Sequence, residues 1–277
     1  MTAKTSQPSP SLLGELLRQW RARRGMSQLS LALEADVSAR HISFIESGRS
    51  QPSRDMVLTL ARALDTPLRE HNVFLEAAGF ARLYRESELS APELRQAHRT
   101  LEFIIRQQEP NMTLVMNRHW DVLMSNDAGR RLMSLFIADP TEVCPDGPIN
   151  ALRLTFHPRG LRRWIVNWEE VAGSLLLRLH REVSASGEDD YTRRLVEELI
   201  GYGGVPARYH TPDFTEPAAP FIPLVLRHAG ITLEFFTTVT TLGTAQDITL
   251  QELRIESYLP ADQATEAFVR QLANQQS

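Results

Sequence analysis

The chain has 277 residues, of which 42% are hydrophobic and 23% are charged, and its formal net charge is −4. This length suits one large domain or two modest domains with a substantial core, and the composition excludes disordered and fibrous proteins. The single cysteine, Cys144, excludes an internal disulfide and a metal site built from several thiolates.

The N-terminal sequence MTAKTSQPSPS lacks the basic start and apolar run of a secretion signal, and no apolar run approaches the roughly 18 residues of a membrane span. We therefore expect a cytoplasmic protein without a membrane partner, and a flexible segment over residues 1–10. Residues 1–80 carry ten basic and eight acidic side chains, whereas residues 81–277 carry twenty and twenty-six. The mild positive surplus lies at the N-terminal end, where it would favour nucleic acid.

Two short amphipathic helices are predicted at the start of the chain. The segment from Leu12 to Arg23 has apolar residues at spacings of three and four, and Gly25 ends it. Ser27 can then cap a second helix over QLSLALEA. The inner face of this second helix is expected to consist of Leu29, Ala32 and Leu33.

A third helix is predicted to follow the N-cap Ser38 and to end at Gly48, which suits a left-handed backbone conformation. Ile42 and Ile45 should point inward. The opposite face is expected to consist of Ala39, Arg40, Ser43 and Phe44.

Two more helices complete this region. Ser53 caps a fourth helix that is apolar from Met56 to Leu64, and a fifth helix spans about Arg69 to Ala78. Five short helices, with a small-residue turn between the second and the third, are typical of domains that place a helix in the major groove of DNA.

The residues MSQLSLALEADVSARHISFIESGRSQPS, followed by MVLTLARALDTPL, resemble the xenobiotic-response-element family of repressors, which is related to the phage repressors. The Ser-Gln helix start, the I-x-x-I-E-x-G segment and the Pro-Ser cap occur in the family's order and spacing over residues 12–78. The resemblance implies an all-α, lambda-repressor-like helix-turn-helix domain over residues 11–80, whose partner is double-stranded operator DNA.

The resemblance also implies DNA contacts at individual positions. Gln28 matches a residue that contacts a phosphate and supports the third helix. Arg40 is the strongest candidate for base recognition, because a guanidinium can bond O6 and N7 of guanine together. Phe44 departs from the polar residue common at its position and offers only contact with a thymine methyl or a base face. The full predicted set is Gln28, Ser38, Ala39, Arg40, His41, Ser43, Phe44, Arg49 and Arg54, in which Arg49 and Arg54 would contact phosphates.

Glu46 is poorly placed for DNA, and the resemblance implies that it pairs with an arginine of the first helix, here Arg21. The alternative for the whole set is a helical domain with ordinary solvated arginines. Helix patterning, caps and motif agree with one another, which favours DNA binding.

The pattern changes after a connecting helix that is predicted within residues 81–110. MTLVM and WDVLM predict a hairpin, and NDAGRRLMSLF predicts a helix capped by Asn126. Further helices are predicted from Leu161 to Val183 and from Asp190 to Ile200. Two strands should then flank a turn at residues 228–230, and a fifth strand should pass through residues 253–255. The inward residues of the fourth strand are expected to be Ile231, Leu233, Phe235 and Val239.

Five strands with helices inserted between the second and the third predict a PAS-like sensor domain over residues 111–277, and therefore an α+β protein. The residues NRHWDVLMSNDAG, NALRLTFHPRGL, IVNWEE and FFTTVTTLGTAQDITLQELRIESYLPAD resemble the MmyB-like regulators, bacterial repressors with a C-terminal PAS-like domain. This resemblance covers the chain from Leu12 to about Asp262. It implies a bound fatty acid or a similar small hydrophobic ligand, and no required cofactor.

A PAS-like domain has a concave sheet covered by helices, where a ligand cavity would be largely apolar. Arg118 or Arg153 could pair with a ligand carboxylate. Asn117, Asn126 or Asn167 could donate hydrogen bonds or simply cap helices or turns. The candidate apolar lining is Trp120, Leu132, Phe136, Leu152, Leu154, Trp164, Leu176 and Phe235, and plain core packing is the alternative for each of them.

The sequence contains no G-x-S-x-G elbow, phosphate-binding glycine loop, H-E-x-x-H or dinucleotide fingerprint, so we expect no enzyme. The histidines show no metal-ligand spacing. Because one helix-turn-helix unit contacts only a few base pairs, we expect a homodimeric, sequence-specific repressor that responds to a hydrophobic ligand. Two alternatives remain for the C-terminal domain: a ligand-free scaffold for dimerisation or partner binding, and a tethered enzyme or haem or flavin sensor.

Overall fold

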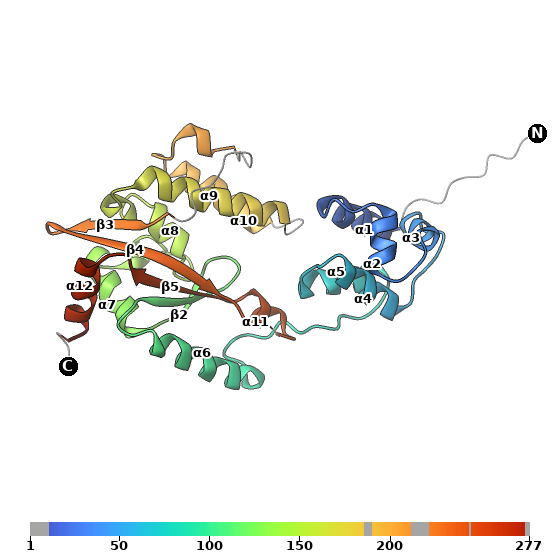
Figure 1. The fold of residues 1–277 in the computed structure, drawn as a ribbon, viewed down its shortest axis with the longest axis horizontal. Coiled ribbons are helices and arrows are strands. Elements are labelled where there is room, and N and C mark those ends of the chain that lie inside the picture. The colour runs from blue at the N-terminus through green and yellow to red at the C-terminus, as the bar shows by residue number, and fades with distance from the viewer. Residues whose placement is uncertain (1–10, 186–189, 212–221, 244, 275–277) are drawn as a thin grey trace, which may run out of the picture. The chain divides into compact units, whose positions relative to one another are not determined.

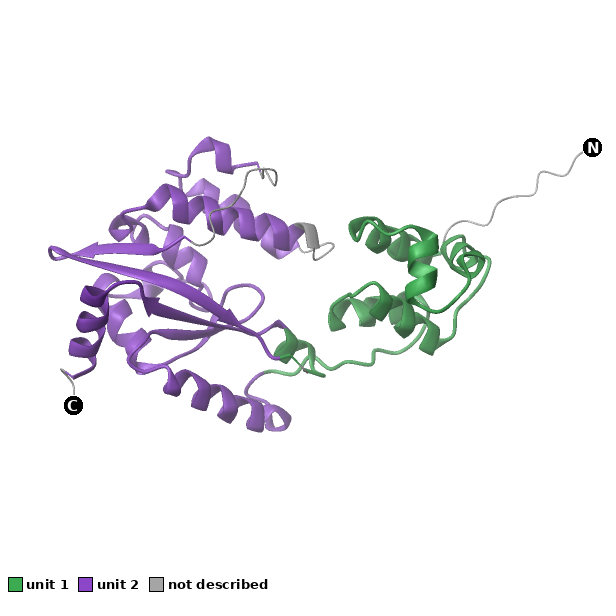
Figure 2. Ribbon diagram, viewed as in Figure 1, with its two compact units in different colours: residues 1–88, 243–251 green, residues 89–242, 252–277 purple. Residues whose placement is uncertain are grey.

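The structure, a computed structural model, describes residues 11–185, 190–211, 222–243 and 245–274. The chain divides into two compact units, Met1–Glu88 with Gly243–Gln251 and Leu89–Leu242 with Glu252–Ser277 (Figure 2). We call them unit 1 and unit 2. The flexible segment predicted for residues 1–10 lies outside the described residues. Unit 1 therefore combines the N-terminal region with a short segment from late in the chain.

Unit 1 contains the five predicted helices. They are α1 (Leu12–Arg23), α2 (Gln28–Glu34), α3 (Ala39–Glu46), α4 (Arg54–Ala63) and α5 (Leu68–Ala77). Serine side chains cap the first four of these helices by accepting a hydrogen bond from a backbone N–H three residues ahead. Their apolar faces meet in one core, whose most buried members include Leu17, Ile42, Leu60 and Phe74.

The predicted inner face of α2 is wrong at two positions. Leu29 and Leu33 are 61% and 75% exposed, whereas Leu31, Ala32 and Ala35 are buried. This short helix carries apolar residues on two faces, and both sets have helical spacing. Periodicity alone does not decide between them, and the packing of α2 against α3 and α4 does.

Asn72 of α5 holds the chain that leaves the helices. Its amide oxygen accepts hydrogen bonds from the backbone N–H groups of Leu83 and Tyr84 at 2.9 and 3.1 Å, and its amide nitrogen donates to the carbonyl of Tyr84 at 2.8 Å. Residues 83–84 are thereby fixed to α5 without forming a helix or strand.

The late segment of unit 1, residues 243–251, packs on this part of the chain. The Ile248 N–H donates to the carbonyl of Arg85 at 2.8 Å, and a carboxylate oxygen of Asp247 accepts from the Ser87 N–H at 3.3 Å. The side-chain oxygen of Gln251, on α11 (Ile248–Glu252), accepts from the Leu68 N–H at 2.8 Å. Since the N-cap Pro67 supplies no side-chain acceptor, Gln251 caps α5 from 183 residues away.

Unit 2 contains a five-stranded antiparallel sheet with the strand order β2-β1-β5-β4-β3 (Figure 1). The strands are β1 (Thr113–Met116), β2 (Val122–Ser125), β3 (Leu224–His228), β4 (Ile231–Thr240) and β5 (Arg254–Pro260). The helix predicted within residues 81–110 is α6 (Arg95–Gln107), which follows a short 3-10 turn. The α+β fold, with helices inserted between the second and third strands, is as predicted.

The helices inserted between β2 and β3 are α7 (Asp127–Phe136), α8 (Ala151–Phe156), α9 (Trp168–Ala185) and α10 (Asp190–Gly201), and α12 (Gln263–Asn274) ends the described chain. The sequence analysis missed α8, α11 and α12. None of the described helices is long and apolar enough to cross a membrane.

The helix predicted from Leu161 to Val183 is interrupted. A 3-10 turn covers Leu161–Trp164, and α9 begins only at Trp168. Between them the chain is extended and pairs with β3, where the Val166 N–H donates to the carbonyl of Val225 at 2.8 Å. Asn167 reinforces this pairing by accepting from the Val225 N–H at 3.2 Å. The apolar residues that pair with the edge strand β3 were therefore predicted wrongly as part of a helix.

The two faces of the sheet have different partners. Cross-strand pairing places Leu114 beside Glu256 and Leu224 beside Phe235 on one face, which belongs to the main core with α7, α8, α9 and α10. Val115 and Ile255 alternate to the other face, where α6 packs on β1. Of the four residues predicted inward on β4, Leu233 and Phe235 are buried. Ile231 and Val239, towards the strand ends, are exposed.

Candidate functional site

The surface of α3 presents the residues predicted to meet DNA. Ile42 and Ile45 are fully buried and anchor the helix, while Arg40 is exposed on the other side. Ser38 acts as the N-cap and accepts from the His41 N–H at 3.2 Å. The half-buried members of this surface are Ala39, His41, Ser43 and Phe44.

Phe44 contacts Arg40 one helical turn earlier. The guanidinium carbon of Arg40 lies 5.1 Å from the centre of the Phe44 ring, within the range of a cation–π interaction. The aromatic ring thus gives the flexible arginine a platform, which limits the conformations it must lose on binding. The sequence analysis missed this role, although the i, i+4 spacing was a signal for it.

Glu46 connects α3 to the two preceding helices. Its carboxylate, only 2% exposed as a residue, accepts from Arg21 Nε at 2.9 Å and Nη2 at 3.2 Å, and from Gln28 Nε2 at 2.8 Å. The pairing of Glu46 with Arg21 is confirmed. Gln28 supports α3 through the same carboxylate, and its phosphate contact stays a prediction.

Gly14 allows α1 to approach the end of α3. A Cβ atom at this position would overlap with the backbone carbonyl of Glu46, so no larger residue fits without a shift of the backbone. Arg18, one turn later, donates from Nη2 to the same carbonyl at 3.2 Å. The orientation of α3 therefore depends on a close backbone contact as well as on the buried ion pair.

Arg49 and Arg54 lie on either side of the loop that joins α3 to α4, and both are exposed. Gly48, which has a φ of 73°, provides the left-handed residue that ends α3. The two guanidinium groups are thus accessible beside α3, and their phosphate contacts stay a prediction.

Unit 2 contains an apolar cavity between its helices and the inner face of the sheet. The cavity consists of two adjoining chambers of about 150 and 350 Å³, which share Met112, Met133, Thr155, Leu161 and Tyr258. The smaller chamber, called chamber A, is also lined by Leu132, Val171, Ser174, Leu175, Arg178, Ile222, Leu224, Leu226, Phe235, Thr237 and Glu256. The larger, chamber B, is also lined by Leu114, Val122, Ser125, Gly129, Arg130, Ser134, Ile137, Ala138, Pro140, Ile149, Ala151 and Leu154.

Chamber A has a polar end. Burial raises the pKa of the Glu256 carboxyl, whereas the charges of Arg178 and Arg254 and a hydrogen bond with Thr237 oppose the rise. Burial, followed by the nearness of Glu256, also raises the pKa of Tyr258 well above its ordinary value. The uncharged form of Glu256 is therefore favoured relative to an exposed glutamate.

Trp120 and Glu182 hold the arginines at this end. The guanidinium carbons of Arg178 and Arg254 lie 4.3 and 5.2 Å from the centre of the Trp120 ring. Glu182 pairs with Arg254 at 2.9 Å and with Arg178 at 3.4 Å. It also accepts from Trp120 Nε1 at 3.2 Å. One carboxylate and one aromatic ring thus position both guanidinium groups.

Three of the predicted ligand-binding residues line the chambers: Leu132 and Phe235 face chamber A, and Leu154 faces chamber B. Trp120 is buried beneath the arginines that flank chamber A. The described lining of the two chambers also leaves out Phe136, Trp164 and Leu176. Phe136 and Trp164 pack edge to face, and Leu176 is fully buried.

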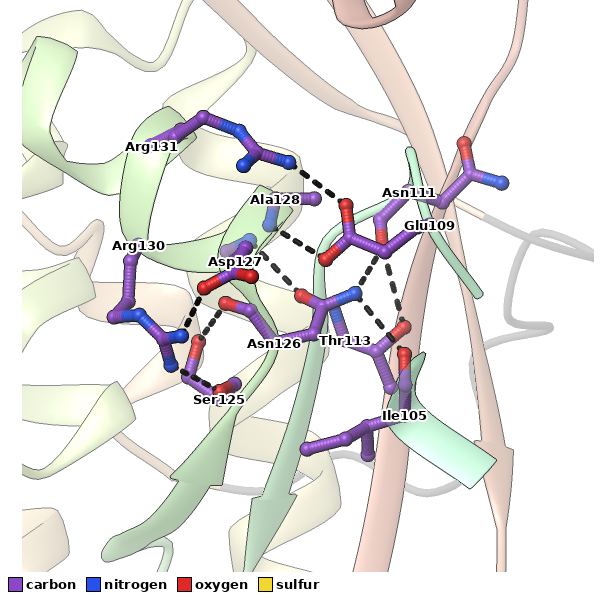
Figure 3. A network of polar contacts seen from close by, with 11 residues as sticks. Ile105, Glu109, Asn111, Thr113, Ser125, Asn126, Asp127, Ala128, Arg130 and Arg131 are labelled. Atoms are coloured by element: carbon purple, nitrogen blue, oxygen red, sulfur yellow. Dashed lines mark hydrogen bonds and ion pairs between the residues drawn. The ribbon is translucent and has the colours of Figure 1, made fainter. Parts of the chain in front are cut away.

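Asn126 is the N-cap of α7, and its side chain is hydrogen-bonded within the protein (Figure 3). Its amide oxygen accepts from the Thr113 and Gly129 N–H groups at 3.0 and 2.9 Å. Its amide nitrogen donates to the carbonyls of Ile105 and Asn111 at 3.2 and 2.8 Å. Because both ends of the amide are engaged within the protein, the alternative of a helix cap accounts for this residue.

The two arginines predicted to meet a carboxylate lie elsewhere. Arg118 is 3.8 Å from a carboxylate oxygen of Glu252. Arg153 makes a bidentate contact with Glu198 at 2.8 and 2.9 Å, in a polar depression that also includes Tyr202. The arginine that chamber A presents is Arg178, which the sequence analysis did not select.

A signal for the polar end was present in the sequence. Arg254, Glu256 and Tyr258 alternate along β5 with Ile255 and Ser257, so one face of the strand carries three polar residues. Polar residues on a covered face are unusual, so this pattern could have indicated the polar end of chamber A. The partner residue Arg178 gave no such signal, since a single arginine within an amphipathic helix is ordinary.

Two family models match the chain. Residues 97–272 match the MmyB-like transcription regulator ligand binding domain, and residues 17–71 match the helix-turn-helix family. Both are families of transcription regulators and not of enzymes. No curated protein matches.

Two solved structures show limited similarity. The clp gene regulator ClgR from C. glutamicum is 30% identical over 25% of this chain and 87% of that chain, with a TM-score of 0.22. An RNA-binding Light-Oxygen-Voltage receptor is 12% identical over 96% of this chain and 63% of that chain, with a TM-score of 0.25. The match to the ligand-binding family extends over more than half of the sequence. The chain therefore belongs to the MmyB-like transcription regulators, and it is a DNA-binding regulator with a helix-turn-helix domain and a ligand-binding domain.

Proposed function

We propose that this regulator binds its operator as a homodimer and represses transcription, and that a small hydrophobic molecule of the fatty-acid type in unit 2 controls binding. The observation that carries the proposal is the apolar cavity of chambers A and B. Ligand sites are typically concave and mostly apolar with a few polar groups, and the larger chamber alone has a volume in the range of such sites.

The cavity favours a ligand over a ligand-free scaffold. Apolar side chains that remain in contact with water lower stability. A scaffold gains nothing from chambers lined by Met112, Met133 and Leu161, whereas a ligand would restore the missing contacts. Flexible methionines at the junction of the chambers also suit ligands of variable shape.

The surface of α3 supports the DNA-binding half of the proposal. Arg40 is exposed, stacked on Phe44 and carried by a helix that Glu46 fixes to α1 and α2. One such helix contacts too few base pairs for a useful specificity ratio. A dimer on a two-fold site, with half-sites about one helical turn apart, supplies the additional base contacts.

Arg40→Ala tests the DNA contact. We expect the loss of about 1–3 kcal/mol of operator binding and a relaxed preference at one base pair per half-site, measured by gel-shift titration with randomised sites. Arg82→Ala is the matched control, because Arg82 is an exposed arginine of unit 1 outside α3 and pairs with Glu76. Unchanged affinity and preference in Arg40→Ala would contradict the assignment of α3.

Mass spectrometry tests the ligand and the dimer. The native spectrum of the purified protein should show twice the chain mass, and the denaturing spectrum should show a released molecule of a few hundred daltons.

Repression is tested by transcription in vitro from an operator-linked promoter. The amount of transcript should fall when the regulator is added. A monomer that shows no bound molecule, even after incubation with fatty acids, would contradict the proposal.

A further inference from the structure

We infer that the exposed face of α6 is a second DNA-binding surface, on which Arg95, Arg99 and Arg106 contact phosphates of the duplex. We call these three residues the arginine row. They lie in unit 2, outside the residues 17–71 that match the helix-turn-helix family. The inference goes beyond the proposed function and depends neither on a ligand nor on a dimer.

The packing of α6 leaves one side of the helix in solvent. Leu101 and Ile105 are buried, and the helix packs on β1. Arg95, Arg99 and Arg106 are all exposed. An α-helix turns about 100° per residue, so the three arginines lie within a sector of about 40°. At about 1.5 Å per residue the arginine row is about 16 Å long. The helix thus presents a straight row of positive charges.

The arginine row has no acidic partner among the described residues, since none of its three side chains makes a hydrogen bond or an ion pair there. Several other exposed arginines of unit 2 pair with a carboxylate: Arg193 with Asp190, Arg208 with Glu169 and Arg270 with Glu266. The charges of the row are therefore free to bind an external anion, whereas the paired arginines are already compensated.

Glu102 is the single acidic residue in the sequence of α6, and it lies on the same side of the helix as the arginine row. It contacts His98 at 3.8 Å. With Glu102 included, this side of the helix has a net charge of about +2, from three guanidinium groups and one carboxylate. The rest of this region is acidic, since residues 81–277 carry twenty basic and twenty-six acidic side chains. The positive charge is therefore a local feature of α6.

Duplex DNA fits the arginine row better than an acidic protein does. Phosphates recur every 3.4 Å of axis along one strand, so a row of about 16 Å spans several of them. A protein partner would require an apolar centre with a charged rim. The exposed apolar residue of this helix, Phe103, is 63% exposed and lies outside the sector of the three arginines. The linear arrangement of the charges thus favours a linear polyanion.

The covalent connection keeps α6 near a unit that binds DNA. Six residues, 89–94, join Glu88 of unit 1 to Arg95. Even when fully extended they hold these two residues within about 25 Å of each other, whatever the arrangement of the units. Contacts tethered over such a distance act at an effective concentration in about the millimolar range. Phosphate contacts that are weak by themselves would therefore add to the affinity of the whole protein for DNA.

The test measures how the DNA affinity of the full-length protein depends on salt. Fluorescence anisotropy is recorded with an operator duplex, and with an unrelated duplex of the same length, between about 50 and 200 mM salt. In Arg95→Gln/Arg99→Gln/Arg106→Gln the slope of log affinity against log salt should become less steep by about 2–3 per chain, since each phosphate contact contributes about 0.9. The change should be equal on both duplexes, because phosphate contacts do not depend on sequence.

The matched control is Arg193→Gln/Arg208→Gln/Arg270→Gln, which removes the same charge from exposed, paired arginines of the same unit. It should keep the native slope. Glu102→Gln should raise the affinity for both duplexes, because it removes a negative charge from beside the phosphates. Phe103→Ser should leave DNA binding unchanged. Thermal unfolding shows whether each variant is folded, and the three single substitutions, each with a shift of about 0.9, replace a triple variant that is not.

The inference is overturned if the variants of the arginine row keep the native slope, if the control triple variant lowers the slope as much, or if Glu102→Gln binds DNA more weakly. A native slope in the row variants together with a loss of operator affinity in Arg40→Ala would leave the proposed function intact. It would show that unit 1 alone contacts DNA, and that the exposed face of α6 serves an acidic protein partner instead. Loss of DNA affinity in neither variant would contradict the assignment of α3 as well.

Discussion

Glu46 is a buried carboxylate whose partners come from two other helices, so its loss should affect more than one contact. In Glu46→Gln the guanidinium of Arg21 loses its charged acceptor, and one of the two oxygens that accept from Arg21 and Gln28 becomes a donor. We expect the free energy of unfolding of unit 1 to fall by about 2 kcal/mol, from the strength of hydrogen bonds to charged groups. Urea denaturation monitored by circular dichroism measures the change.

The control for this experiment is Glu76→Gln, which removes a carboxylate from the same unit. Glu76 pairs with Arg82, and both side chains are largely exposed, so little change in stability is expected. Operator affinity should fall in Glu46→Gln and remain unchanged in the control, because the Glu46 side chain, unlike that of Glu76, joins α3 to α1 and α2. Equal stabilities of the two variants would show that the buried pair contributes no more than a surface pair.

Glu256 should make stability depend on pH in an unusual direction. A folded-state pKa above that of the unfolded chain means that the folded protein binds the proton more tightly, so stability falls as the pH rises above about 4.3 and through the folded pKa. The charged and titratable groups that face this carboxyl are Arg178, Arg254 and Tyr258. The charges of the two arginines lower the pKa of Glu256, but burial raises it by more.

Glu256→Gln removes this titration while keeping the shape of the side chain. We expect the difference in unfolding free energy between the variant and the native protein to increase, in favour of the variant, from pH 5 to pH 8 in urea denaturation. His71 and His180, whose pKa values are lowered by burial, add stability as the pH rises. Their contribution is the same in both proteins and cancels. A difference that does not vary with pH would show that Glu256 is ionised as readily as an exposed glutamate.

At the scale of elements, α5 depends on an acceptor from a distant part of the chain. Gln251→Ala leaves the Leu68 N–H without its side-chain acceptor, and losing a helix cap costs about 1 kcal/mol. Hydrogen exchange at the Leu68 amide should become faster in this variant. Gln251→Glu keeps an acceptor and adds a negative charge at the helix N-terminus, so it should protect this amide at least as well as the native residue.

Gln246→Ala is the matched control, since Gln246 lies in the same segment and is exposed. It should leave exchange at Leu68 unchanged. Equal exchange in Gln251→Ala and Gln246→Ala would mean that water replaces the glutamine oxygen without cost, and that the segment does not stabilise α5.

The helices of unit 1 were predictable because their signals are local. Serine caps, glycine ends and apolar spacing occur within each helix, and they place α1 to α5 within a residue or two. The inner face of α2 was predicted wrongly because its two apolar faces are equivalent until α3 and α4 pack on it. The segment 243–251 gave no signal, since hydrogen bonds between Gln251 and Leu68 join residues that sequence patterns do not relate.

The lining of the candidate ligand site was predictable only in part, because it also depends on contacts between distant parts of the chain. Large apolar residues were correctly expected in the core of unit 2, yet burial alone does not separate Leu132 and Phe235, which line chamber A, from the fully packed Leu176. Arginines were selected by their position near quoted motifs. In the structure Arg153 pairs with Glu198, whereas Arg178 shares the carboxylate of Glu182 with Arg254. Such ion pairs join distant parts of the chain, so motif positions alone do not reveal them.

At the scale of the whole molecule, the two strands that wall the cavity are covalently continuous with the DNA-binding unit. Phe235 and Thr237 of β4, and Glu256 and Tyr258 of β5, line chamber A. The connection between these strands contains residues 243–251, which belong to unit 1. A ligand changes DNA binding only if it favours one arrangement of the protein over another. If a ligand shifts either strand, we expect the β4–β5 connection to transmit the shift to the contact between Gln251 and the start of α5.

The double variant Asp247→Ala/Gln251→Ala tests this route, because it removes the side chains that hold the segment to Ser87 and Leu68. We expect the ratio of operator affinities with and without dodecanoic acid, measured by fluorescence anisotropy, to move towards one. The affinity for dodecanoic acid itself should remain unchanged, because neither residue lines the described cavity.

Gln246→Ala should keep the native ratio, which separates the effect of the two contacts from that of any substitution in the segment. Allosteric coupling between two sites is typically about 1–3 kcal/mol, so the native ratio of operator affinities should be about fivefold or larger. A decrease of this ratio towards one can therefore be measured. If the double variant keeps the native ratio although Leu68 exchanges faster, the contacts of the segment stabilise unit 1 without transmitting the ligand's effect. The two side-chain contacts would then not be needed for coupling, and the backbone connections between the units, such as that at residues 88–89, would be tested next.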